Sequence, residues 1–518
     1  MWRPMHFLLL ILLGAAAATG FAPLEWLPVT LLAFAVWLRL VHDAPTLKRA
    51  LLAGWLFGVG HFTINNNWIQ HAFDFQDRMP PVLGYIAVVA LALYLAMYPM
   101  LAAGLAWRLA SPRAAGDGTT RPGASYILVA AAAWIVAEWL RARMFTGYAW
   151  DPLGVAWLAL PDVALAARFV GTYAMSGLMV LTAGALMLLT ERRWAPAAAL
   201  AALFAVLVLI NIGYVPDSAA TVAADAPRVR VIQPNISQQV KRTRAHEEET
   251  LRRLIALSGR PGSAPRLVVW PEGAVDPFLE DGYPADWYYK GDPAAARAAV
   301  AGVLGPRDQA LVGGNALFFR GEELTGAGNS IFVVDPQARL GGRYDKAHLV
   351  PGGEYLPMRS LLEPLGLSRL VAGEVDFIEG PGPQTILVPG FGPIGMQICY
   401  EIIFSGQVVD RERRPAMLFN PSNDAWFGSW GPVQHLAQAR MRAIEEGLPV
   451  IRSTPNGISA VIGVDGSIVA QVPRFTAGAV ELPIPAALPP TLFAQFGNWM
   501  AVASVLVLLV LAVVLRRR

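Results

Sequence analysis

Long apolar runs dominate the first 214 residues of the chain, and one more run lies close to its C-terminal end. A helix needs about 20 apolar residues to cross a bilayer. The pattern therefore predicts a bundle of about eight membrane helices, seven within residues 1–214 and an eighth at 497–515. The seven runs lie at 5–21, 24–40, 50–70, 82–107, 125–140, 169–190 and 194–213.

Residues 227–480 show a different pattern, in which short apolar strands alternate with charged or alanine-rich helices. Strands are predicted at 228–235, 266–271, 310–315, 329–335, 385–388, 395–399, 449–453, 458–464 and 467–472. Helices are predicted at 241–258, 294–304 and 432–447. This alternation is typical of a layered α/β domain. The stretch 215–226, rich in alanine and aspartate, indicates a linker before it.

Composition supports a membrane part joined to a soluble part. The chain is 55% hydrophobic and 15% charged, against about 25% charged residues in soluble domains, which argues against an ordinary cytosolic enzyme and excludes disorder. Residues 1–214 hold 13 basic and 9 acidic residues, and residues 215–498 hold 25 and 29. The high pI therefore does not indicate a nucleic-acid-binding face. The single cysteine, Cys399, excludes an internal disulfide and a multi-cysteine metal site.

The basic residues predict an orientation. If the N-terminus is cytoplasmic, 12 basic residues lie on the cytoplasmic side and 4 on the other. The 12 are Arg3, Arg39, Lys48, Arg49, Arg108, Arg113, Arg121, Arg192, Arg193, Arg516, Arg517 and Arg518, and the 4 are Arg78, Arg141, Arg143 and Arg168. The positive-inside rule then places both termini in the cytoplasm and residues 215–495 outside it. The first run also has features of a cleaved signal peptide, with small residues at 15–20.

Two polar stretches interrupt the membrane part, at 61–68 and at 145–150 beside Arg141 and Arg143. One interpretation is interfacial anchoring by their Trp, Tyr and Asn side chains. The other is a lipid-headgroup site in which the two arginines face phosphate. The sequence leaves both open.

Three segments of the second part carry reactive side chains. Cys399 and Glu272 each follow a predicted strand, at the edge where ligand clefts form, and Lys346 lies in the polar segment 342–351. A helix starting near Cys399 would lower the pKa of its thiol. A buried carboxylate can take a thiol proton, and a lysine can stabilise an oxyanion. Taken singly, the three residues fit better as a buried structural cysteine, a solvated glutamate and a surface lysine.

Together these residues resemble the nitrilase, or carbon–nitrogen hydrolase, superfamily, whose members use a Glu–Lys–Cys triad in an αββα sandwich. Wider motifs are similar to the apolipoprotein N-acyltransferase family. They are Trp270-Pro271-Glu272, Tyr344-Asp345-Lys346, Gly353-Glu354-Tyr355, Ser422-Asn423-Asp424-Ala425-Trp426-Phe427-Gly428, Gln434-His435, Ala439-Arg440-Met441-Arg442-Ala443 and Arg452-Ser453-Thr454. The resemblance covers nearly the whole chain, because that family has eight membrane helices around an extracytoplasmic nitrilase-like domain.

The resemblance implies an acyltransferase that moves an acyl chain from a membrane phospholipid to a lipoprotein. The acceptor is the α-amino group of an N-terminal S-diacylglyceryl-cysteine. Cys399 would carry the acyl group as a thioester, Glu272 would be the base, and Lys346 would hold the oxyanion. By motif position, supporting or substrate-binding roles fall to Glu354, Glu401, Tyr400, Trp426 and Asn423. For Tyr400 and Trp426, core and turn packing is an equal alternative.

The family also implies a place and partners for the protein. It predicts the bacterial inner membrane, with the catalytic domain on the periplasmic side and membrane lipids around the helices. No metal, cofactor or nucleic acid is expected, and a monomer is the working expectation, although the sequence does not define the oligomeric state. Ala149, Arg242 and Gly352 depart from the family pattern. The apolar segment 361–367 is expected to dip into lipid or to pack as a short core helix.

Two other functions remain open from the residues alone. A membrane-bound nitrilase-type amidase would use the same triad with water in place of the amine. A non-enzymatic transporter with an external binding domain would need neither the thiol nor the base. Charged residues are almost absent from the helix centres and no paired repeats are evident, which weakens the transporter interpretation.

Overall fold

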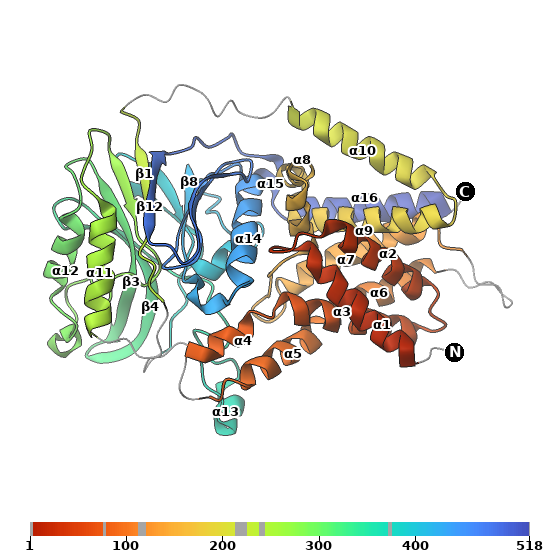
Figure 1. Cartoon of the computed structure of the whole chain (residues 1–518), viewed down its shortest axis with the longest axis horizontal. Coiled ribbons are helices and arrows are strands. Elements are labelled where there is room, and N and C mark those ends of the chain that lie inside the picture. Colours follow the sequence, from red (N-terminus) through yellow and green to blue (C-terminus); the bar gives the residue numbers. More distant parts are fainter. Residues whose placement is uncertain are drawn as a thin grey trace.

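The computed structural model describes residues 4–75, 79–111, 121–212, 225–237, 244–370 and 376–516. Several residues of the sequence analysis lie outside these ranges. They are Arg3, Arg78, Arg113, Arg242, Arg517, Arg518 and most of the predicted linker at 215–226. Within the described ranges, a helical bundle is joined to a sandwich of two sheets (Figure 1). The predicted fold class is confirmed.

Each predicted apolar run forms a helix or a pair of helices. The helices of this half are α1 (Pro4–Ala17), α2 (Leu27–His42), α3 (Leu47–Asn65), α4 (Ile69–Ala72), α5 (Leu83–Leu95), α6 (Met97–Ala110), α7 (Ala124–Arg141), α8 (Pro161–Ala164), α9 (Ala167–Thr190), α10 (Ala195–Ile212) and α16 (Trp499–Arg516). The run at 82–107 bends at Ala96, close before Pro99, because proline disturbs the preceding helical turn. The start of α1 and the end of α16 lie at the end of the bundle farthest from the sheets (Figure 1).

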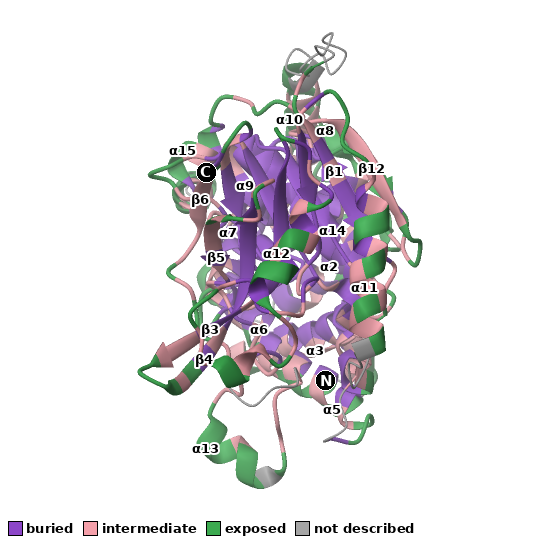
Figure 2. Ribbon diagram, turned by 90° about the vertical axis from the view of Figure 1, so that its left-hand side faces the viewer, coloured by how far each residue is buried: buried purple, intermediate pink, exposed green. Residues whose placement is uncertain are grey.

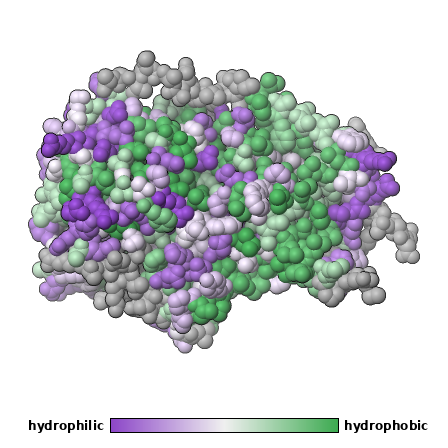
Figure 3. All heavy atoms as spheres, viewed as in Figure 1, coloured by the Kyte–Doolittle hydropathy of each residue, from purple (hydrophilic) through white to green (hydrophobic). Residues whose placement is uncertain are grey.

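In the described part of the chain, four helices are long and apolar enough to cross a membrane: Leu83–Ala110, Ala124–Arg141, Ala167–Thr190 and Trp499–Arg516. Shorter apolar helices lie at Met5–Gly20, Leu27–His42 and Ala195–Ile210. On the face drawn in Figure 3, apolar surface gathers over the helical half, and polar surface covers its far end and much of the sandwich. This surface is the one expected of a bundle in lipid with a solvated domain at one end.

The first helix is an integral part of the bundle. A Cβ at Gly14 of α1 would lie 1.9 Å from the Phe57 carbonyl oxygen of α3, and a Cβ at Gly60 would lie 1.9 Å from the Ile11 carbonyl oxygen. Such a close approach of two backbones is possible only with glycine at the contact.

The second half consists of two six-stranded sheets, ordered β12-β1-β2-β3-β4-β5 and β11-β10-β9-β8-β7-β6. The strands are β1 (Arg228–Gln233), β2 (Arg266–Val269), β3 (Gln309–Arg320), β4 (Glu323–Val334), β5 (Leu340–Asp345), β6 (Gln384–Val388), β7 (Gly392–Met396), β8 (Met417–Pro421), β9 (Val450–Ser453), β10 (Ser459–Ile462), β11 (Ile468–Val472) and β12 (Gly478–Pro483). Strands β1–β2–β3 and β7–β8–β9 run parallel within their sheets, and the outer strands are antiparallel.

Helices cover the outer face of each sheet and complete an α–β–β–α sandwich. Helices α11 (Arg244–Ser258) and α12 (Pro293–Ala301) lie on the first sheet, and α14 (Gly431–Glu446) lies between the second sheet and the bundle (Figure 1). Buried residues fill the space between the layers (Figure 2). The second sheet is therefore the one next to the membrane helices. Two short helices, α13 (Arg359–Leu362) and α15 (Leu492–Phe496), lie outside these layers.

Candidate active site

The predicted site residues lie at the carboxyl ends of strands from both sheets. Glu272 follows β2 and Lys346 follows β5 in the first sheet, while Cys399 follows β7 and Asn423 follows β8 in the second. Strands β2 and β5 point the same way, because two antiparallel steps, β3 to β4 and β4 to β5, separate β5 from the parallel pair β2–β3. The sandwich thereby brings polar residues of four strands to one edge.

The first sheet supplies a buried network of charges. Lys346 Nζ lies 2.9 Å from each carboxylate oxygen of Glu354 and 4.0 Å from Glu272 Oε1. Asn329 Nδ2 donates to Glu272 at 2.6 Å and to Glu354 at 3.1 Å. The second oxygen of Glu272 accepts from the Asn423 N–H at 2.7 Å. Glu354, which the motifs place among the supporting residues, is therefore the direct partner of Lys346.

This network shifts the pKa of both catalytic candidates in it. Burial raises the pKa of Glu272, as does the charge of Glu354, while Lys346 opposes the shift. For Lys346, burial alone would lower the pKa, but the carboxylates of Glu354 and Glu272 outweigh it and raise the pKa. Glu272 is thus a stronger base than a solvated carboxylate, beside a lysine that stays charged.

Cys399 sits in a constrained turn that begins the short 3₁₀ helix Cys399–Ile403. Its φ of 51° is unusual for a residue with a Cβ. Glu401 holds this turn: Oε2 accepts from the Ile398 N–H at 2.5 Å, and Oε1 accepts from the Ala347 and His348 N–H groups at 2.6 and 3.0 Å. The carboxylate thus ties the turn to the loop that follows Lys346.

The thiol lies close to the charges of the first sheet. Burial raises the pKa of Cys399, and Glu272 raises it further, while Lys346 and a hydrogen bond from the Asn423 N–H lower it. The predicted lowering of the thiol pKa by a helix N-terminus is therefore wrong. The helix is a single 3₁₀ turn, and desolvation of a thiolate at 5% exposure outweighs it. A thiol in this position needs a base to ionise, and Glu272 is the adjacent candidate.

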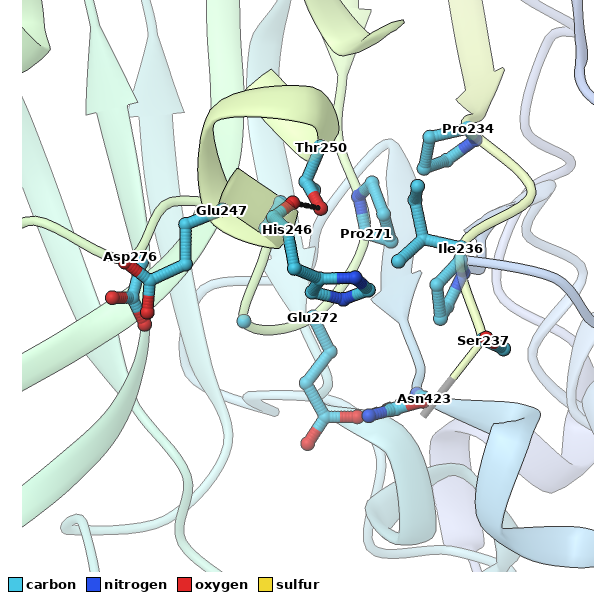
Figure 4. Close-up of a pocket in the computed structure, with 13 residues that line it drawn as sticks. Pro234, Ile236, Ser237, His246, Glu247, Thr250, Pro271, Glu272, Asp276 and Asn423 are labelled. Carbon is cyan, nitrogen blue, oxygen red and sulfur yellow. Dashed lines mark hydrogen bonds between the residues drawn. The ribbon is translucent and has the colours of Figure 1, made fainter. Parts of the chain in front are cut away.

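A cavity of about 40 Å³ opens beside Glu272, on the side of α11 (Figure 4). Its lining includes Glu272, Asn423, Pro234, Ile236, His246 and Thr250. Tyr400 and Trp426 are not among the described residues that line it. The Tyr400 hydroxyl donates to the Gly147 carbonyl at 3.4 Å, and Trp426 packs edge-on against Phe75. Both side chains thus contact the helical half of the chain.

The two polar stretches of the membrane part contribute to the contact between the halves. Gln434 on α14 donates to Asn65 at 3.0 Å and accepts from Trp150 Nε1 at 2.9 Å. Arg141 is 2% exposed and donates to the Trp150 carbonyl at 2.7 Å. Arg141 is therefore held inside the protein, which contradicts the interpretation that it faces lipid phosphate.

Sequence reasoning gave no role to Asn329 or His435. Asn329 bridges the two carboxylates from the middle of β4, and its signal was a polar Asn-Ser pair directly before the apolar residues 331–334. His435 lies within a recognised motif, but its contact with the Cys399 carbonyl, 3.0 Å from Nε2, depends on where α14 packs.

Two facing sheets with a buried cysteine, glutamate and lysine at their edge define a domain of the carbon–nitrogen hydrolase class. The profile of that family, described as carbon-nitrogen hydrolase, matches residues 228–488, and the apolipoprotein N-acyltransferase N-terminal domain matches residues 13–185. The chain belongs to the apolipoprotein N-acyltransferase family and is an acyltransferase.

Relatives that carry this family name match along the whole chain. The apolipoprotein N-acyltransferase of Bradyrhizobium diazoefficiens is 35% identical, and that of Rhodopseudomonas palustris is 33% identical, each over 100% of this chain and 96% of its own length. The one from Haemophilus ducreyi is 31% identical over 94% of this chain and 92% of its own length. The transporter interpretation finds no support among them.

Solved structures resemble the chain over about half its length. A nitrilase-superfamily member from Saccharomyces cerevisiae is 17% identical, covers 54% of this chain and 96% of its own, and has a TM-score of 0.36. An amidase from Nesterenkonia sp. is 16% identical, with the same coverage and a TM-score of 0.34.

Proposed function

We propose that the protein transfers an acyl chain from a membrane phospholipid, through a thioester on Cys399, to the α-amino group of the S-diacylglyceryl-cysteine of a lipoprotein. The observation that carries this proposal is the buried thiol beside the Glu272–Lys346–Glu354 network, on the sheet that packs against the membrane helices. Catalysis would be of the covalent, two-step kind.

In the first step, Glu272 takes the proton of the Cys399 thiol, and the sulfur attacks the ester carbonyl of the phospholipid. Lys346 and backbone N–H groups stabilise the negative charge that forms on the carbonyl oxygen. The C–O bond of the ester then breaks, and Glu272 returns its proton to the leaving lysophospholipid. The products of this step are a lysophospholipid and an acyl thioester.

In the second step, the α-amino group of the acceptor attacks the thioester carbonyl. Glu272 accepts a proton from the nitrogen, the C–S bond breaks, and the thiolate of Cys399 recovers a proton. The raised pKa of Glu272 suits both transfers, since a base is most effective when its pKa approaches the working pH. The products are an amide and the starting thiol.

The placement in the membrane follows from the same architecture. The start of α1 and the end of α16 lie at one end of the bundle and the sandwich at the other (Figure 1). With the excess of basic residues at that first end, the positive-inside rule favours cytoplasmic termini and a periplasmic catalytic domain in the bacterial inner membrane. Two lipid substrates then reach the thiol without leaving the bilayer, which avoids about 0.8 kcal/mol for each CH₂ exposed to water.

The test is intact-mass analysis of the purified full-length protein after incubation with phospholipid vesicles, with Cys399→Ala as control. We expect a gain of one fatty-acyl mass on the wild type alone, and its loss when a diacylglyceryl-cysteine peptide is added. A folded wild type that gains no acyl mass contradicts the proposal. An acyl mass that water discharges as fast as the peptide does would favour a lipid hydrolase instead.

A further inference from the structure

The carbonyl oxygen of Cys399 is held by two buried side chains that the proposed chemistry does not use. His435 Nε2 lies 3.0 Å from this oxygen, and Asn420 Nδ2 lies 3.3 Å from it. Because a carbonyl oxygen only accepts hydrogen bonds, the Nε2 atom of His435 must carry a proton. Both side chains are fully buried.

The other side of the imidazole explains why the proton stays on Nε2. Arg452 Nη2 lies 3.0 Å from His435 Nδ1 and 2.6 Å from Asp424 Oδ1. Asp424 Oδ1 also lies 3.2 Å from Nδ1, and it is paired with the same guanidinium. In the neutral ring Nδ1 accepts from Arg452, and the proton on Nε2 is present in the neutral and in the charged ring alike. Burial and the charge of Arg452 also lower the pKa of His435 to about 4, in agreement with this hydrogen-bond arrangement.

The ring is also fixed by two aromatic neighbours, Trp150 in the helical half and Phe427 in the segment after β8. Its centroid lies 5.4 Å from the ring of Trp150 and 5.5 Å from that of Phe427. The preceding residue, Gln434, hydrogen-bonds to both Trp150 and Asn65. One turn of α14 therefore contacts the membrane helices and the backbone of the nucleophile together.

We propose that His435 is a positioning residue, which acts through the Cys399 carbonyl to hold the peptide group that follows the nucleophile. The peptide is planar and trans, so fixing the carbonyl also fixes the Tyr400 N–H, which points the opposite way. It also holds Cys399 at a φ of 51°, which a residue with a Cβ does not adopt readily. The expected effect on acyl transfer rests on the proposed function, but the effect on the thiol does not.

Two amide substitutions, His435→Gln and His435→Asn, distinguish this positioning role from a role in packing alone. In His435→Gln, the amide nitrogen can reach the place of Nε2 and donate to the Cys399 carbonyl. In His435→Asn, the side chain is one methylene shorter and its amide reaches only the place of Nδ1. We expect Asn and Ala to slow acylation of Cys399 about 100-fold, the effect of a small displacement of a reacting group. We expect Gln to restore most of the rate, with the KM for phospholipid unchanged in all three.

The second measurement is the rate of Cys399 alkylation by iodoacetamide, followed by intact mass on protein whose melting temperature confirms the fold. Alkylation needs no lipid, so it tests the role of His435 independently of the proposed function. If the wild type forms no thioester, the proposed function is refuted, but the difference in alkylation rate between His435→Gln and His435→Asn still tests the role of His435. Equal rates for Gln and Asn in both assays overturn the inference. A His435→Ala variant with wild-type rates also overturns it. A His435→Gln variant that fails to fold does the same, because the proposal requires only a hydrogen-bond donor at that position.

Discussion

The two sheets supply different kinds of group to the site and hold them by different means. On the first sheet, Glu272, Lys346 and the loop residue Glu354 are charged and hold one another, with the closest pair at 2.9 Å. On the second sheet, Cys399 is held at its backbone by hydrogen bonds from His435 and Asn420. The reaction as proposed must pass a proton from one sheet to the other.

The two sheets also differ in their distance from the membrane helices. The second sheet carries α14, which packs against α9, whereas the first sheet is covered by α11 and α12 at the far side (Figure 1). In the proposed mechanism, the residues that move the proton therefore lie on the sheet away from the membrane helices, and the residues that position the sulfur lie on the sheet next to them. Substitutions on the first sheet should change proton transfer. Substitutions on the membrane side should change the position of Cys399 or the packing of the sandwich against the membrane helices.

Removal of the base on the first sheet should have the largest effect. Glu272→Gln retains the size of the side chain but cannot take the thiol proton, so the rate of acyl-enzyme formation should fall by about 10² to 10⁴. Time-resolved intact mass measures it. The matched control is Glu280→Gln, at a half-buried partner of Arg343 outside the site, which should acylate normally. Normal acylation in Glu272→Gln would remove this residue from the mechanism.

Loss of the lysine should cost stability as well as activity. Lys346→Met leaves Glu272 and Glu354 as buried carboxylates without a counter-charge, and breaking such a pair costs about 3–5 kcal/mol. Adding Glu354→Gln removes one of the two charges. The double variant should therefore regain much of the melting temperature lost in Lys346→Met, but not the acylation rate. Recovery of both would mean that the lysine serves the fold alone.

On the membrane side, a buried carboxylate joins α14 to α9, together with Arg442 Nη2, which donates to the Thr172 hydroxyl at 2.6 Å. Glu445 Oε1 accepts from the Thr172 N–H and hydroxyl at 2.7 and 2.6 Å, and Oε2 lies 2.7 Å from Arg442 Nε. Glu445→Gln removes the negative charge that lies against the buried guanidinium of Arg442, so the free energy of unfolding should fall by about 3 kcal/mol. Thermal unfolding measures the effect. Glu481→Gln, which breaks half-exposed pairs with Arg228 and Arg230, should cost no more than about 1 kcal/mol.

The pH dependence of acylation should depend on the charge of Glu354, which lies beside the proposed base Glu272. Because the pKa of Glu272 is raised by burial and by Glu354, the rate should fall on acidification with a midpoint above 4.5. In Glu354→Gln the like charge is absent, so this midpoint should move to lower pH, by about one unit. Rates of acyl-mass gain between pH 4 and pH 9 give the profile. A midpoint that stays in place or rises would show that Glu354 does not act on the base.

The sequence predicted the elements that a strong local pattern encodes. The apolar runs of the bundle are long, and each forms a helix or a pair of helices. Strands β5, β8 and β12 were not predicted, because β5 contains Gly341 and Gly342, β8 ends in Pro421, and β12 is a half-buried edge strand without clear alternation. Strand order could not be predicted, since β12 pairs with β1 across more than 240 residues.

The candidate site residues could be predicted from ordered motifs in the sequence. The environment of these residues could not be predicted in this way. Glu272, Lys346 and Cys399 stand in recognisable surroundings, and the fold brings them to one edge. The role of Asn329 depends on two carboxylates that come from other segments. The shift of the Cys399 pKa was predicted in the wrong direction, because burial by the second sheet and α14 is a tertiary effect.

The smallest effect is expected at the exposed segment around α13, which projects from the molecule (Figures 1 and 2). Leu361 is 60% exposed and Met358 is 68% exposed, so neither packs in a core, as one interpretation of segment 361–367 required. If this segment meets lipid, Leu361→Ser removes about 1 kcal/mol of apolar burial and should raise the KM for phospholipid vesicles about fivefold. Its melting temperature should not change.

The control for that variant is Leu387→Ser, at a leucine on β6 that is 73% exposed. If α13 acts by touching the membrane, only Leu361→Ser should raise the KM, because the two substitutions remove the same apolar side chain from different places. The difference should vanish when a short-chain ester in solution replaces the vesicles, since such a donor needs no bilayer contact. Equal KM values for both variants on vesicles would show that α13 plays no part in reaching the lipid.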